Sequence, residues 1–314
     1  MIDVEQVYKS FNGTRALDGF TLHIPRGELF GLVGPNGAGK TTLIKTLATL
    51  LRPQSGRAAI DGIDVTRDPQ AIKRLIGYLA DQPGLYQEMS VREFLEFFAD
   101  AFVLRGGRRR SAVARALQRS GLEARSSAYV EELSFGMKQR LLLAKTLLHE
   151  PRVLLLDEPA TGLDPMARVE LREQLRALSA DGVTILISSH ILSDLEDICT
   201  QVALIAEGRN AKDGEGREVI PLRGQQAKAP LYEVEVLGDP AAVVAALAPV
   251  TGIRLVRQEG KQLLVEVAGS ETEAAALLRT LVLGGVAVAH FVRRDVGLED
   301  EYRRAFSVPS GGRA

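Results

Sequence analysis

The chain has 314 residues, of which 46% are hydrophobic and 25% are charged, a globular composition that allows one large or two medium domains. Its formal net charge of −1 gives no reason to expect a nucleic-acid partner, and the single cysteine, Cys199, excludes an intramolecular disulfide and favours a reducing compartment. The apolar runs are shorter than the roughly 20 residues that span a bilayer. The first residues also lack the pattern of a signal peptide, so we expect a cytoplasmic protein.

Residues 1 to about 215 alternate short apolar runs with amphipathic helical patterns, which predicts an α/β domain with a mainly parallel sheet. Apolar residues at consecutive positions indicate strands that are covered on both faces. Three runs of this kind are Leu29 to Val33, Val153 to Leu156 and Val183 to Ile187. Lys40 to Leu51 carries a helical stripe, and residues 91 to about 150 are expected to form an inserted helical subdomain.

The composition changes near Glu207, where a predicted hairpin leads into a linker at residues 216–230. Residues 231–306 then show two helical and four strand patterns in the order βαββαβ, with the first helix at Pro240 to Leu247. This order predicts a small α+β domain of ferredoxin-like fold. We expect the tail, 307–314, to be disordered.

A glycine-rich segment fits the phosphate-binding pattern G-x-x-x-x-G-K-[ST] between a predicted strand and a predicted helix. Its residues are Gly34, Pro35, Asn36, Gly37, Ala38, Gly39, Lys40 and Thr41, followed by Thr42. Such a loop points successive N–H groups at phosphate oxygens, and the helix adds the positive end of its dipole. Lys40 is expected to reach the β- and γ-phosphates of ATP, and Thr41 to offer its hydroxyl to Mg²⁺. The alternative, a glycine-rich turn that binds nothing, does not explain the lysine and threonine. We therefore expect the segment through Thr42 to bind ATP.

A second motif has the form of a Walker B strand, because an apolar run ends in Asp157 and Glu158. The carboxyl ends of parallel strands are where α/β sheets bind ligands. Asp157 is expected to orient Mg²⁺, and Glu158 to polarise the attacking water. Two solvated acids after a strand are the ordinary alternative, which the nearby phosphate-binding loop disfavours.

The segment LSFGMKQR, Leu133 to Arg140, resembles the signature motif of the ABC-type ATPases. In that family the serine and the second glycine of the motif touch phosphate, which assigns these roles to Ser134 and Gly136. Phe135 and Met137 depart from the usual Gly and Gln.

Further segments resemble other motifs of the same family. Thr161 to Pro165 resembles the D-loop, with Asp164 as its acid, and His190 resembles the switch histidine that contacts the γ-phosphate. Phe11 stands 29 residues before Lys40, at the position of the aromatic ring that stacks on adenine. Taken singly, these motif residues have structural alternatives: Phe11 as a core ring, Ser134 as a helix cap and His190 as a hydrogen-bonded histidine. Their joint order makes residues 1 to about 215 resemble an ABC-type ATPase.

The resemblance implies a P-loop NTPase fold, in which a RecA-like parallel sheet carries an inserted helical subdomain and an antiparallel β part. It implies ATP and Mg²⁺ as cofactors. The phosphate loop and the signature of one chain face different nucleotides in this family, so catalysis requires a head-to-tail pair, either a homodimer or a pairing with another ATPase subunit. A groove beside residues 91–150 would receive an integral membrane permease, which would place the protein at the cytoplasmic face of the cell membrane.

The signature, the segment Leu79 to Tyr86 and the appended C-terminal domain resemble exporter-type subunits that pair with separately encoded permeases. Two alternatives remain open. One is an ABC ATPase with no role in transport. The other is a regulatory module acting on a soluble partner, whose C-terminal domain senses a ligand or stabilises the dimer.

One loop departs from the family where it usually has a glutamine that senses Mg²⁺. Counting back ten residues from Val91 places Asp81 at that position, and Gln82 follows one residue later. Successive side chains of an extended loop point to opposite sides, so Asp81 or Gln82 faces the metal, but not both. We favour Asp81, because it keeps the spacing and a carboxylate is a competent Mg²⁺ ligand. A turn in which neither residue touches the ion is the alternative.

Overall fold

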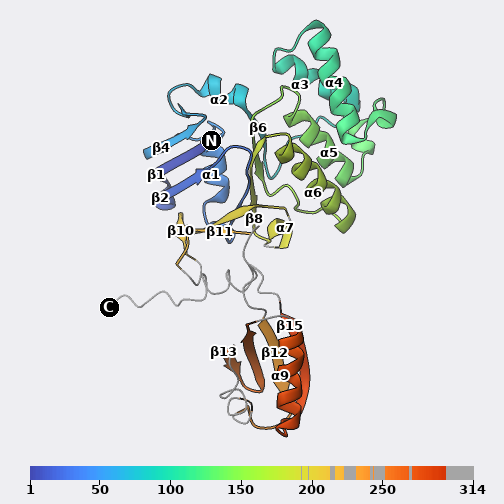
Figure 1. Cartoon of the computed structure of the whole chain (residues 1–314). Coiled ribbons are helices and arrows are strands. Elements are labelled where there is room, and N and C mark those ends of the chain that lie inside the picture. The colour runs from blue at the N-terminus through green and yellow to red at the C-terminus, as the bar shows by residue number, and fades with distance from the viewer. Residues whose placement is uncertain are drawn as a thin grey trace. The chain divides into compact units, whose positions relative to one another are not determined.

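The computed structural model describes residues 1–191, 193–196, 198–212, 216–222, 231–240, 243, 252–268 and 271–294. The chain divides into a larger unit, Met1–Arg223, and a smaller one, Gly224–Glu301 (Figure 1). The predicted tail and most of the helix predicted at Pro240 to Leu247 lie outside the described residues. Among the helices that are described, none is both long and apolar enough to cross a membrane.

A seven-stranded sheet forms the centre of the larger unit, with the order β10-β9-β3-β8-β7-β6 and with β11 also paired to β9. The strands are β3 (Leu29–Val33), β6 (Ile76–Leu79), β7 (Val153–Asp157), β8 (Thr184–Ser189), β9 (Gln201–Ala206), β10 (Arg209–Ala211) and β11 (Val219–Pro221). The five strands β3, β6, β7, β8 and β9 run parallel, whereas β10 and β11 are antiparallel to β9. Every residue of β3, β7 and β8 is buried, as the consecutive apolar positions predict. The predicted parallel core is confirmed.

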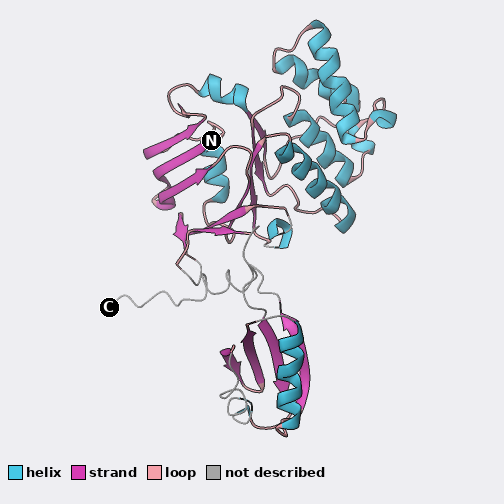
Figure 2. Cartoon of the chain, viewed as in Figure 1, coloured by secondary structure: helices cyan, strands magenta, loops and turns pink. Residues whose placement is uncertain are grey.

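A second, antiparallel sheet has the order β2-β1-β4-β5 (Figure 2). Its strands are β1 (Ile2–Phe11), β2 (Thr14–Ile24), β4 (Ser55–Ile60) and β5 (Ile63–Asp64). Helix α1 (Lys40–Leu47) contacts β7 of the parallel sheet and β2 and β4 of the antiparallel one. Its side chains Leu43, Ile44 and Leu47 join one hydrophobic core that includes residues of both sheets. This core fixes the position of the loop that precedes α1.

Helix α1 is shorter than the predicted Lys40 to Leu51. It ends at Leu47, and Thr49 adopts a left-handed φ of 62°, which a right-handed helix does not contain. The leucines that extended the predicted stripe lie in the following turn, where Leu50 is exposed. Apolar periodicity therefore overestimated the length of this helix.

The described part of the larger unit contains further helices besides α1. They are α2 (Pro69–Leu75), α3 (Val91–Ala101), α4 (Gly106–Ser120), α5 (Phe135–Thr146), α6 (Pro165–Ala180) and α7 (Ser193–Glu196), with 3₁₀ turns η1 (Glu123–Arg125) and η2 (Val130–Glu132). Ser90 and Glu93 form a reciprocal capping box that starts α3. Helices α3 to α5 contact one another and lie within the stretch predicted to be helical. Figure 1 shows α1 and α6 on opposite faces of the parallel sheet.

The smaller unit contains an antiparallel sheet with the order β13-β14-β12-β15 and helix α9 (Glu271–Leu283). Its strands are β12 (Leu231–Val236), β13 (Ile253–Glu259), β14 (Gln262–Val267) and β15 (Val288–Arg294). The hairpin of β13 and β14, then α9, then β15 follow one another in the predicted order. Strand β11, by contrast, lies inside the stretch predicted as a linker and belongs to the sheet of the larger unit.

Truncation of a core side chain in β7 should destabilise the larger unit. Leu155 is fully buried in the shared core, so Leu155→Ala should lower the free energy of unfolding by about 2–5 kcal/mol through lost burial and a residual cavity. Chemical denaturation followed by circular dichroism measures this loss. Val169→Ala, on a side chain that is 43% exposed on α6, is the matched control and should change stability little. Equal losses in the two variants would contradict the assignment of β7 to the core.

Candidate nucleotide-binding site

The phosphate-binding loop connects β3 to α1 in a conformation that only glycine permits at two positions. Gly39 has a φ of 113°, and a Cβ placed there would lie 2.4 Å from the carbonyl oxygen of Ala16. A Cβ on Gly34 would lie 2.2 Å from the carbonyl oxygen of Ile205. The glycine pattern in the sequence therefore reflects both a left-handed turn and a close approach to neighbouring backbone.

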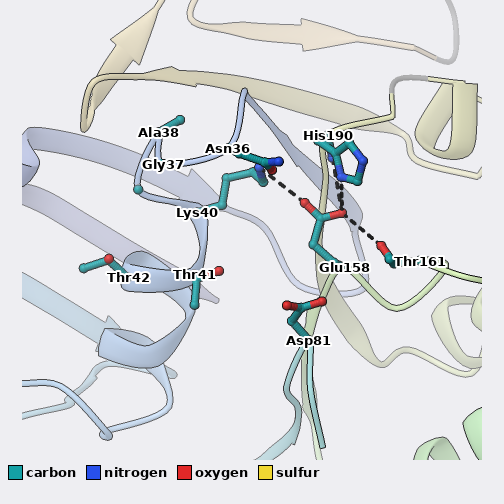
Figure 3. A pocket seen from close by; sticks show the side chains of 11 residues that line it. Asn36, Gly37, Ala38, Lys40, Thr41, Thr42, Asp81, Glu158, Thr161 and His190 are labelled. Carbon is teal, nitrogen blue, oxygen red and sulfur yellow. Dashed lines mark hydrogen bonds and ion pairs between the residues drawn. The ribbon is translucent and has the colours of Figure 1, made fainter.

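The loop wraps around a cavity of about 320 Å³ at the carboxyl edge of the parallel sheet (Figure 3). The cavity is lined by Asn36, Gly37, Ala38, Gly39, Lys40, Thr41, Thr42, Asp81, Glu158, Thr161 and His190. These residues come from the loop and α1 and from the segments that follow β6, β7 and β8. Polar side chains from separate elements converge on one concave space beside a helix N-terminus, which suits an anionic ligand.

Lys40 is 5% exposed and places its ammonium group within this site. Its Nζ donates to the carbonyl oxygens of Gly34 at 2.7 Å and Pro35 at 3.2 Å. The same Nζ lies 3.3 Å from Oε1 of Glu158. Two residues of the predicted motif, Gly34 and Pro35, thus hold the lysine in place.

The Glu158 carboxylate lies between Lys40 and His190 (Figure 3). Its Oε2 is 2.8 Å from Nδ1 of His190 and accepts a longer, 3.5 Å bond from the Thr161 hydroxyl. A hydrogen on Nδ1 satisfies this contact and leaves Nε2 for another partner. The residues predicted for water activation and for γ-phosphate contact are therefore in direct contact.

Asp157 is completely buried at the end of β7. Burial raises the pKa of its carboxyl, an effect that a hydrogen bond from Ser188 and an interaction with Thr41 oppose and that the charges of Asp81 and Glu158 reinforce. The Ser188 hydroxyl donates to Oδ1 at 2.7 Å and accepts from the backbone N–H of Glu158 at 3.0 Å. Within the described residues, Oδ2 has no hydrogen-bond partner. A buried carboxylate oxygen with free acceptor capacity, next to a threonine hydroxyl, fits a hard divalent cation.

Asp81, rather than Gln82, lines the cavity as far as the structure describes it. Its charge contributes to the raised pKa of Asp157 and, after burial and the charge of Asp157, to the pKa of Tyr78, which rises to about 12. This geometry agrees with the spacing argument that favoured Asp81.

The signature residues Ser134 and Gly136 and the D-loop acid Asp164 lie outside this cavity in the part of the chain that is described, whereas Thr161, the first residue of the D-loop, lines it. Ser134 caps α5 by accepting from the backbone N–H of Met137 at 3.3 Å. Asp164 caps α6 by accepting from that of Ala167 at 2.9 Å. Gly136 lies at the start of α5, facing α6. Both motifs therefore stand at helix N-termini.

Phe11 is 44% exposed at the end of β1, and the ammonium of Lys9 lies 5.2 Å from its ring centroid. This excludes the alternative that Phe11 is a core residue. The ring is available for stacking, and it lies outside the set of described residues that line the cavity.

Sequence reasoning gave no role to Thr161 or Ser188, although both bond the acidic pair. Thr161 opens the segment recognised as the D-loop, and Ser188 stands two residues before His190. The available signal was a hydroxyl residue near the end of one buried strand, because another buried strand ends in an acid.

Comparison with known proteins agrees with this geometry. A family model described as ABC transporter matches residues 17–161. The chain is 36% identical over 304 residues to the Nod factor export ATP-binding protein I of Burkholderia pseudomallei (strain 1710b), and the match covers 96% of each chain. The chain belongs to the ATP-binding subunits of ABC transporters. It is an ATPase coupled to transmembrane transport.

Other members of the family are similar over shorter stretches. The daunorubicin resistance ATP-binding protein of Streptomyces coeruleorubidus is 38% identical over 253 residues, which is 80% of this chain and 79% of that one. The dimeric structure of MJ0796, a bacterial ABC transporter cassette, superposes with a TM-score of 0.62 at 25% identity and covers 71% of this chain and 100% of that one. The predicted family and the P-loop ATPase fold are confirmed.

Asp157→Asn should change how the free energy of unfolding depends on pH. Because burial raises the folded-state pKa of Asp157 above the ordinary value of about 3.9, the folded protein holds this proton more tightly than the unfolded chain does. Wild-type stability therefore falls as the pH rises from below the ordinary pKa through the raised one, and the variant lacks this contribution. We expect the variant to gain stability relative to wild type over this window, measured by urea unfolding. A difference that is constant with pH would contradict the raised pKa.

Proposed function

We propose that this ATPase powers outward transport as one half of a head-to-tail pair of ATPase subunits bound to a separately encoded integral membrane permease. One observation carries the pairing. The cavity that holds Lys40, Glu158 and His190 is lined without Ser134 and Gly136 in the described part of the chain. A second subunit would supply these two residues to complete the site.

In the paired arrangement the phosphate loop of one subunit and the signature of the other enclose ATP. Each brings the N-terminus of a helix, α1 or α5, whose free N–H groups and dipole favour anionic phosphates. Lys40 would bind the β- and γ-phosphates, His190 would contact the γ-phosphate, and Phe11 would stack on the base. Asp164, at the start of α6, would lie at the contact between subunits.

The acidic groups divide into two roles. Thr41, Asp157 and Asp81 would hold Mg²⁺, which when bound would neutralise charge on the phosphate oxygens. Glu158 is left to polarise the attacking water, and its bond to His190 orients its carboxylate. The unpartnered Oδ2 of Asp157, within the described region, supports this assignment.

The names of the relatives, Nod factor export and daunorubicin resistance, favour outward transport by this chain. The same names favour transport over the alternative of an ABC ATPase that acts elsewhere. The small C-terminal unit exposes apolar side chains, among them Leu237, Val282 and Leu283. We assign it to lengthening the contact between subunits at the cytoplasmic face of the membrane.

Glu158→Gln should retain ATP binding and lower the rate of hydrolysis by about 10²–10⁴-fold, because the amide keeps the shape of the side chain and loses its basicity. Single-turnover release of labelled ADP measures the rate, and size exclusion with ATP should show a long-lived dimer. Lys40→Ala is the control, since it should lose nucleotide binding itself. Wild-type turnover in Glu158→Gln would remove Glu158 from its proposed role.

A mixing experiment tests the composite site. Ser134→Arg places a long side chain where the partner's nucleotide must approach, so this variant should bind ATP as a monomer and lack ATP-dependent dimerisation. Lys40→Ala should be inactive through loss of phosphate binding. A mixed dimer of the two retains one intact site, made of Lys40 from one chain and Ser134 from the other. Mixtures that recover no ATPase activity above that of either variant would contradict the shared site.

A further inference from the structure

Tyr78 lies near the carboxyl end of β6, on the face of the parallel sheet that packs against α1. Its backbone pairs with Leu155 of β7, and its side chain packs against the core that contains Leu155 and Leu43 of α1. Side chains alternate between the two faces of a strand, so Asp157, two residues after Leu155, points to this same face. The ring of Tyr78 and the carboxylate of Asp157 therefore stand on one face of two adjacent strands.

The hydroxyl group is the buried end of the Tyr78 side chain, which is half-buried as a whole. Among the described residues, this hydroxyl oxygen has no hydrogen-bond partner, and the same holds for the buried Oδ2 of Asp157. A phenolic hydroxyl carries a hydrogen to donate, whereas an ionised carboxylate only accepts. One strand thus presents a spare donor, and its neighbour presents a spare acceptor.

Two acids act on the hydroxyl of Tyr78. Burial, then the charge of Asp157 and then that of Asp81 raise the pKa of Tyr78 to about 12. Tyr78 therefore keeps its proton at neutral pH and remains a donor. Asp81 is exposed and lines the open cavity, where solvent can hydrate its carboxylate. Asp157 is completely buried, so it is the acid that needs a donor from the protein.

The hydroxyl and Oδ2 of Asp157 do not bond each other directly, since neither has a partner among the described residues. A polar pair at longer range is commonly joined by a water molecule that bonds both groups. A water that accepts from Tyr78 has two hydrogens left, and one of them can go to Oδ2. Because a carboxylate oxygen has two lone pairs, Oδ2 can accept this bond and still face a cation.

Packing against the core requires the ring of Tyr78 but not its hydroxyl, because phenylalanine would fill the same space. Burying the hydroxyl removes it from bulk water at a cost in free energy, so its presence needs another reason. Groups that hydrogen-bond a metal ligand from behind fix the orientation of that ligand. Loss of such a group typically lowers metal affinity by about 10–100-fold.

We propose that Tyr78 is a positioning residue of the cation site. Its hydroxyl donates to a buried water, and that water donates to Oδ2 of Asp157 and so fixes the orientation of the carboxylate. This role rests on the proposed binding of Mg²⁺ by Asp157 and adds a residue to it. Tyr78 touches neither the cation nor the nucleotide, and it acts through Asp157.

Tyr78→Phe tests this role in the full-length protein, because it removes the hydroxyl and keeps the ring. The probe is Mn²⁺ in place of Mg²⁺, with a non-hydrolysable ATP analogue, and electron paramagnetic resonance measures free Mn²⁺. We expect Tyr78→Phe to lower the Mn²⁺ affinity of the protein–nucleotide complex about tenfold or more. Affinity for the analogue in excess EDTA should not change. Tyr86→Phe, on a side chain that is 51% exposed, is the matched control and should bind Mn²⁺ as wild type does.

Asp157→Asn separates failure of this inference from failure of the cation site. If Tyr78 acts through Asp157, adding Tyr78→Phe to Asp157→Asn should change Mn²⁺ affinity little. Weaker Mn²⁺ binding in Asp157→Asn with unchanged binding in Tyr78→Phe would overturn the role of Tyr78 alone. Wild-type Mn²⁺ binding in Asp157→Asn would overturn the cation site and the role of Tyr78 with it. Equally weakened nucleotide binding in EDTA, or additive effects in the double variant, would show that Tyr78 supports the fold instead of positioning Asp157.

Discussion

Burial of the Asp157 carboxylate is the constraint around which the ATPase unit is arranged. β7 pairs with β6 and β8 and is buried at all five of its residues, so its last side chain is completely removed from water. Full desolvation of an ionised carboxylate costs several kcal/mol unless other groups compensate. The parallel sheet brings compensating groups to the same edge, since Ser188 is the penultimate residue of the neighbouring strand and Thr41 lies in the first turn of α1. The remaining acceptor capacity is what suits this edge to the proposed cation.

The charge balance of the site depends on how Lys40 distributes its three N–H donors. Two go to the carbonyl oxygens of Gly34 and Pro35, and Glu158 takes the third contact, the longest at 3.3 Å. The carbonyl oxygens fix the position of the ammonium, and the carboxylate is the contact most easily exchanged. A phosphate oxygen that replaces Glu158 at Lys40 leaves the carboxylate bonded to His190 and able to accept from water. In the proposed mechanism, one ammonium group would thereby link binding of the triphosphate to the readiness of Glu158 as the base.

Burial on both faces leaves a direct record in the sequence, which is why β3, β7 and β8 were predicted to within one or two residues. The phosphate loop could be predicted from the sequence equally well, because its geometry excludes a side chain at Gly34 and Gly39 and so requires glycine there. The end of α1 could not be predicted in this way, because no residue type in the sequence signals the left-handed turn at Thr49. Sequence spacing favoured Asp81 over Gln82 but could not show which side of the loop faces the cavity.

The helix caps at Ser134 and Asp164 were predicted as functional residues, with a purely structural role for the serine as the alternative. The two roles are compatible. A serine hydroxyl has two lone pairs and one hydrogen, so Ser134 can accept from Met137 and still donate to a phosphate oxygen. The cap also holds the hydroxyl at the N-terminus of α5, where the free N–H groups of the helix favour the same anion. With the proposed nucleotide contact, substitutions at this position would act on helix stability and on that contact together, and only a measurement made between two chains would separate the two effects.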